Sequence, residues 1–139
     1  YRDVEERARQ TGLAASAYAM EARLARVEVH FRRGEWDDAL RVASAPGLRL
    51  ARQHGIKSWI ADNRLLRAIR PKDFEWMGPA IITPLNELGV KRIAIIESQD
   101  AINRFGVNAF MASVIPDTAI TNRLFATSDE ARAWATAPQ

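Results

Sequence analysis

A chain of 139 residues that is 47% hydrophobic can bury one sizeable core, because a folded chain of this length removes about two thirds of its surface from water. The absence of cysteine excludes disulfide scaffolds, thiolate metal sites, iron–sulfur clusters and cysteine nucleophiles. No run approaches the ~20 apolar residues of a membrane span, and the charged opening residues do not fit a signal peptide. We therefore expect a soluble, cytoplasmic protein.

The charges of the chain argue against nucleic acid as a partner. Its 20 basic and 17 acidic residues leave a net charge of only +3, and the two signs are interleaved along the sequence. A nucleic-acid surface gathers basic residues in one tract or on one face, with aromatic side chains that stack on bases. No such tract occurs here.

The first part of the chain predicts a leader followed by a β-hairpin. Residues 1–16 are polar, and we expect them to be loose or helical. In residues 17–31 apolar side chains alternate with small or charged ones, which predicts two strands joined near 23–25.

A helix is predicted next, ending at Gly55. Its apolar residues recur at helical spacing: Trp36, Leu40, Ala43, Gly47 and Leu50. Pro46 lies inside this pattern and removes a backbone donor, so we expect a kink or a break into two helices there.

A buried strand and a second helix follow. The apolar run 56–61 ends at Asp62 and predicts a short strand. Pro71 is suited to the first turn of a helix, because it has no amide hydrogen to leave unpaired. We expect this helix to run to Leu88 and to end at Gly89 in the left-handed conformation.

The remaining elements repeat this alternation. Residues 90–96 predict another strand, and 97–100 contain N-cap residues for a helix that carries Ile102, Phe105, Ala109 and Phe110. Residues 122–126 predict the last strand. Residues 127–130 form a capping box for the last helix.

This order predicts a single α/β domain over 17–139, with a mixed sheet of about five strands and helices packed on it. Ligands and partners of such sheets usually meet the loops at the carboxyl ends of the strands. The segments 62–70 and 97–100 are therefore the regions of interest.

Sequence motifs for catalysis, metals and cofactors are missing. His30 and His54 are the only histidines, and they do not have the spacing of metal ligands. The sequence contains no glycine-rich phosphate loop and no serine in a nucleophile elbow. We expect no enzymatic activity, no metal and no cofactor.

Four segments carry a resemblance to a known fold family, and they are Lys57 to Arg64, Ile69 to Trp76, Gly89 to Ile96, and Phe125 with Glu130, Ala131 and Trp134. Over roughly 17–136 the chain resembles STAS-like domains, the fold of the anti-sigma-factor antagonists, and especially small uncharacterised bacterial proteins grouped with STAS and Sec14-type domains.

The resemblance implies a regulatory, protein-binding domain whose partner surface is the loop after the central strand and the helix that begins there. In phosphoswitch members of the family a Ser or Thr at this helix start is phosphorylated. The segment 62–72 contains neither residue, so phosphoregulation at this loop is not carried over.

Two sets of residues are the candidate binding site in this region. The first is polar and basic: Asp62, Asn63, Arg64, Arg67 and Arg70. Arginine forks suit carboxylates and phosphates, which predicts contact with an anion or an acidic partner. Alternatively, Asp62 and Asn63 close a turn while the arginines are solvated or pair locally.

The second candidate is Trp76. It lies roughly 200° from Phe74 around the predicted helix, opposite the apolar stripe. It is either an exposed interface anchor, for example in a homodimer, or an indole covered by a loop.

The leading hypothesis is a non-enzymatic STAS-like domain that binds a protein partner, or a second copy of itself, through the 62–83 surface. The alternative is a small-molecule or lipid-binding module of the Sec14-like type, because the helices carry more apolar residues than one sheet requires. A large apolar pocket would favour the alternative.

Overall fold

The computed structural model describes residues 17–23, 26–31 and 39–138. The predicted leader 1–16, the residues that join the hairpin at 24–25, and Trp36 lie outside the described residues.

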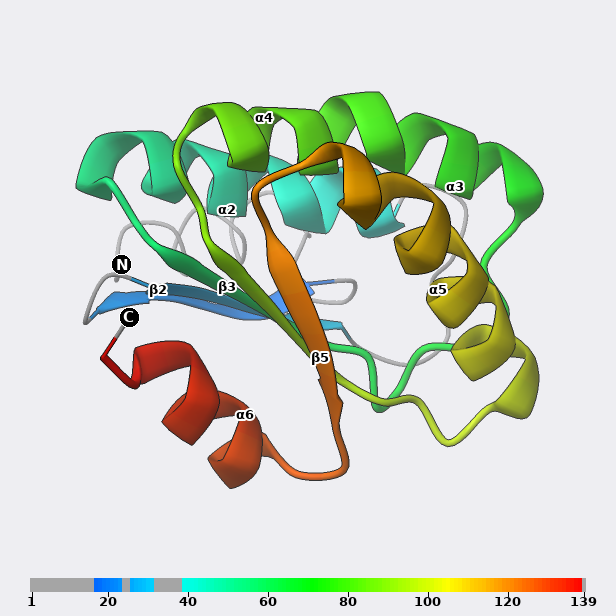
Figure 1. Ribbon diagram of the computed structural model, residues 1–139. Coiled ribbons are helices and arrows are strands. Elements are labelled where there is room, and N and C mark those ends of the chain that lie inside the picture. The colour runs from blue at the N-terminus through cyan, green and yellow to red at the C-terminus, as the bar shows by residue number, and fades with distance from the viewer. Residues whose placement is uncertain (1–16, 24–25, 32–38, 139) are drawn as a thin grey trace.

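The chain has an α/β fold in which helices pack on both faces of a sheet (Figure 1). The strands are hydrogen-bonded in the order β1-β2-β3-β4-β5. β1 pairs antiparallel with β2, while β2 to β5 form a parallel array. The strands are β1 (Ala17–Arg23), β2 (Arg26–Phe31), β3 (Ser58–Asp62), β4 (Arg92–Ile96) and β5 (Thr121–Phe125).

The helices are distributed unequally between the two faces. Parallel strands laid side by side in chain order place their crossover helices on one face, because the crossovers share one hand. Among the described helices, Figure 1 shows α2, α3, α4 and α5 above the sheet and α6 below it. The helices are α2 (Ala39–His54), α3 (Pro71–Met77), η2 (Gly78–Ile82), α4 (Thr83–Glu87), α5 (Ala101–Val114), η3 (Ile115–Asp117) and α6 (Ser128–Thr136).

The helix α2 runs through Pro46 as one element, so of the two alternatives predicted there, a kink or a break into two helices, the break does not occur. Pro46 removes a single backbone donor, and the residues after it are held by packing on the sheet. Gly47 shows how close this packing is, because a Cβ atom added there would lie 2.8 Å from Cη2 of Trp59. The predicted end of the helix is confirmed, since Gly55 has a φ of 57°.

The predicted helix from Pro71 to Leu88 is instead interrupted by a π-helical turn. Pro71 and the left-handed Gly89, with a φ of 86°, mark its ends as expected. Between α3 and α4, the amide of Thr83 bonds the carbonyl of Gly78, five residues back. The turn contains Pro79, which has no amide hydrogen to donate. Sequence periodicity did not predict this change from α-helical to π-helical hydrogen bonding.

Two apolar layers enclose the sheet. On the face of α2 to α5, buried residues of β2, β3 and β4 such as Val29, Trp59 and Ile95 form the larger cluster. On the face of α6, Ile60, Ile96 and residues of α6 form the smaller one. None of the described helices is long and apolar enough to cross a membrane.

Candidate functional site

The two loops predicted to be of interest lie against each other at the carboxyl ends of β3 and β4. Ser98 Oγ donates a hydrogen bond to the carbonyl of Leu66, and Asn103 Nδ2 donates one to the carbonyl of Arg67 at 2.7 Å. The loop after β3 is thus attached to the start of α5.

Asp62 and Arg64 form a local ion pair in this loop. Asp62 is 5% exposed. Arg64 donates to its carboxylate from the backbone amide at 3.2 Å, from Nε at 2.8 Å and from Nη2 at 2.5 Å. This hydrogen bonding raises the pKa of the Arg64 guanidinium above its usual value.

Arg70 is also paired close to its own position. It is the N-cap residue of α3, and its Nε and Nη2 donate to the carboxylate of Asp73 at 2.6 and 3.2 Å. Arg67, by contrast, is exposed. Two of the predicted anion-binding arginines therefore already contact carboxylates of the same chain.

Trp76 is half-buried and packs against the larger core cluster. The helical projection placed it opposite that cluster, but an indole is large enough to reach the core from the flank of a short helix. Trp76 therefore does not have the exposed position expected of an interface anchor.

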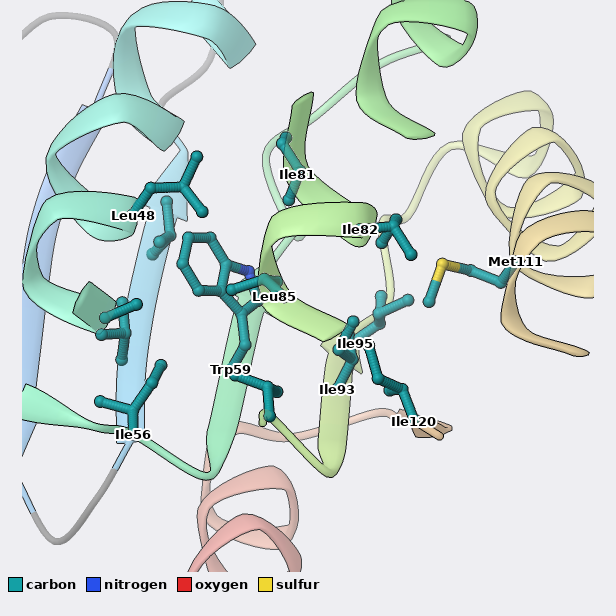
Figure 2. Packing of buried hydrophobic residues seen from close by; sticks show 14 of the residues in the cluster. Leu48, Ile56, Trp59, Ile81, Ile82, Leu85, Ile93, Ile95, Met111 and Ile120 are labelled. Atoms are coloured by element: carbon teal, nitrogen blue, oxygen red, sulfur yellow. The ribbon is translucent and has the colours of Figure 1, made fainter. Parts of the chain in front are cut away.

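A cavity of about 60 Å³ lies between the sheet and the helices of the larger layer. Its walls come from β3 and β4, the loop after β3, the polar residue Ser44 of α2, and α3, η2, α4 and α5, and they include no charged residue. Figure 2 shows Met111 reaching from α5 toward Ile82 and Ile95, which all line this space. Asn63, the first residue after β3, contributes a polar group to it.

A second feature is the outer face of α5, which we define as Ile102, Phe105, Ala109 and Ala112. Ile102 is 70% exposed and Phe105 is 77% exposed, and both alanines are also exposed. The side of α5 that packs on the core is a different one, with Val107 and Met111 buried.

Charged side chains on the α6 face have a structural role. Glu28 is fully buried and accepts hydrogen bonds from Arg26 at 2.6 Å and from two nitrogens of Arg132 in α6 at 2.6 and 2.9 Å. Ser58 Oγ donates to the carbonyl of Ala135 at 2.6 Å. These contacts fix α6 to the sheet, and the described residues contain no group of three or more His, Asp or Glu side chains able to hold a metal ion.

The cavity and the outer face of α5 were not singled out from the sequence. The sequence does contain a signal for the outer face of α5, because residues 102, 105, 109 and 112 are spaced three, four and three apart and none is charged. For Asn63 the sequence indicated a polar loop residue, and only the fold places it on an apolar cavity.

Comparisons with family models, curated proteins and solved structures found no match to this chain.

Proposed function

We propose that the chain is a non-enzymatic, STAS-like protein-interaction domain that acts through the outer face of α5, and that its partner there is a second copy of the chain. The observation that carries this proposal is a helix face with two large exposed apolar side chains and no charge. Isolated exposed apolar residues are common, whereas a contiguous apolar stripe is typical of an interface.

The proposal moves the interaction surface away from the 62–83 region. Arg64 and Arg70 there are paired with Asp62 and Asp73, so an acidic partner would have to compete with existing ion pairs. Trp76 is packed against the core. The outer face of α5 requires no such rearrangement.

The spacing of the outer face suits a paired helix, because three-four spacing is that of the a and d positions of a coiled coil. In an antiparallel pair related by a two-fold axis, Phe105 lies opposite the partner's Ala109, and Ile102 lies opposite the partner's Ala112. Each large side chain then meets a small one, which allows the helices to approach closely. The antiparallel arrangement also aligns the two helix dipoles favourably.

The area available predicts a weak dimer. Phe105 and Ile102 are 77% and 70% exposed, which corresponds to about 150 Å² each for side chains of this size. With the alanines, each copy would bury about 450 Å², and the pair about 900 Å², below the ~1,200 Å² of a standard stable interface. The dimer should therefore form only at micromolar or higher concentrations.

Sedimentation velocity across a concentration series tests the proposal. The wild-type chain should shift from monomer to dimer, whereas Phe105→Glu should remain monomeric with an unchanged melting temperature, since Phe105 is exposed. Leu124→Glu is the matched control, because Leu124 is an exposed apolar residue on β5. A wild-type monomer at all concentrations, or a Phe105→Glu variant that dimerises like wild type, would contradict the proposal.

A small-molecule-binding module is the second candidate, and the cavity beside Asn63 favours it. Its volume of about 60 Å³ is well below the ~300–1,000 Å³ of pockets for drug-sized ligands. A lipid of the Sec14 type would require a much larger space, so this candidate applies to small ligands.

A further inference from the structure

Asn63 has an unusual environment for a buried carboxamide. Its backbone is fully used, since its N–H donates to Ile96 O at 3.0 Å and its carbonyl accepts from the Leu66 amide at 2.9 Å. The residue is only 6% exposed, and it lines the cavity. Within the part of the chain that the structure describes, its side chain makes no hydrogen bond.

Asn103 gives the comparison within the same molecule. It is 1% exposed, and its carboxamide is used, because Nδ2 donates to the Arg67 carbonyl at 2.7 Å. Buried polar side chains normally have such a partner. Asn63 lines the cavity, and its carboxamide has no such partner among the described residues, so it is available to a group that occupies the cavity.

The lining defines the chemistry of that group. A carboxamide offers one acceptor oxygen and two donor hydrogens, and the rest of the wall is almost entirely apolar, without a charged residue. A charged ligand would be left without a counter-ion and would lose its hydration. The ligand expected is neutral, with one hydrogen-bonding end and one apolar end.

The volume limits the size of the ligand. A cavity of about 60 Å³ has room for about four water molecules, at ~15 Å³ each, which fits a molecule of about four or five non-hydrogen atoms. Met77 and Met111 line the cavity, and flexible thioether side chains can adjust to the shape of a ligand.

The position of the cavity is also that of a binding site. It is lined by Asn63, the first residue after β3, and by Ile81 and Ile82 of the π-helical turn. Such turns are frequent at functional sites.

We infer that the cavity beside Asn63 is a binding site for a small neutral molecule with a short apolar body and a terminal amide or hydroxyl group, whose polar end hydrogen-bonds the Asn63 carboxamide. This inference stands apart from the proposed dimer, because the outer face of α5 does not line the cavity.

Methionine methyl NMR tests it directly on the intact protein. The sequence has three methionines. Met77 and Met111 line the cavity, whereas Met20 lies in β1. The ¹³C-methyl signals, assigned through Met77→Leu and Met111→Leu variants, are followed during titration with propionamide and, as its charged counterpart of the same shape, propionate.

Propionamide should shift the Met77 and Met111 signals saturably and leave Met20 unchanged, and propionate should bind at least about tenfold more weakly. Asn63→Leu keeps the branching and the number of non-hydrogen atoms of the side chain and removes the hydrogen bond, so it should weaken propionamide binding about tenfold or more. The spectrum of this variant without ligand reports whether it is folded.

Three results would overturn the inference. They are the absence of a saturable shift, equal binding of propionate, and wild-type affinity in a folded Asn63→Leu variant. The first would indicate that the carboxamide is hydrated by ordered water only. A wild-type protein that binds propionamide but does not dimerise would refute the proposed function and leave this inference intact.

Discussion

Replacing Asn103 and Asn63 separately by leucine should affect stability differently. Both asparagines are at least nine-tenths buried, and leucine has the same branching and the same number of non-hydrogen side-chain atoms, so neither variant should create a large cavity. The difference lies in the hydrogen bonds. Asn103→Leu removes the bond to the Arg67 carbonyl, and it leaves that acceptor facing an apolar side chain.

The loss of one partner from a buried hydrogen bond costs about 1–3 kcal/mol, and we expect about 2 kcal/mol for Asn103→Leu. The amide of Asn103 still bonds Asp100 Oδ1, so the cap of α5 is retained. Asn63→Leu removes no hydrogen bond within the described protein and adds an apolar group to an apolar wall. Its stability should be unchanged or higher by up to about 1 kcal/mol.

Urea denaturation followed by tryptophan fluorescence measures both effects, since the chain has four tryptophans. The midpoint should fall for Asn103→Leu and stay or rise for Asn63→Leu. The free energy of unfolding should decrease with urea concentration at the same slope in both variants and in the wild type. Equal destabilisation by both substitutions would refute the reasoning, because it would mean that the Asn63 carboxamide is as well partnered as that of Asn103.

Three further substitutions test packing, charge and capping by the same measurement. Gly47→Ala should destabilise the protein by about 1–3 kcal/mol, because its Cβ would lie 2.8 Å from Trp59 Cη2; a stability equal to wild type would show that the indole can move aside. Glu28→Ala should cost about 3–5 kcal/mol, since it leaves the buried guanidinium of Arg26 without its carboxylate; a loss below about 1 kcal/mol would contradict the structural role assigned to Glu28. Asp100→Ala should cost about 1 kcal/mol through loss of the N-cap of α5, and an unchanged midpoint would be the contrary result.

Local signals in the sequence predicted the order and the ends of the elements well. The N-cap of the predicted capping box is confirmed, because Thr127 accepts a hydrogen bond from the Glu130 amide at the start of α6. Asp100 caps α5 in the same way, and Gly89 ends the helix before β4. These features depend on neighbouring residues in the chain, and they are therefore readable from it.

Features that depend on contacts between distant segments were not predicted. Helix α5 is apolar on two sides, and periodicity alone could not decide whether Phe105 or Met111 would face the sheet. The pairing of Arg64 with Asp62 was one of two alternatives for that loop. The cavity beside Asn63 is lined by residues of eight separate segments, and no local pattern in the sequence could predict it.

The sequential strand order has a consequence for how the domain assembles during synthesis. Each of the strands β3, β4 and β5 pairs with the strand that precedes it in the chain, so every new βα unit can dock on a surface that has already been translated. The face of the sheet that packs on α6 is an exception to this order. Its residues Ile60 and Ile96 are covered by α6, which follows all five strands. A ribosome-bound chain from which α6 has not yet emerged would thus leave Ile60 and Ile96 without the cover of that helix.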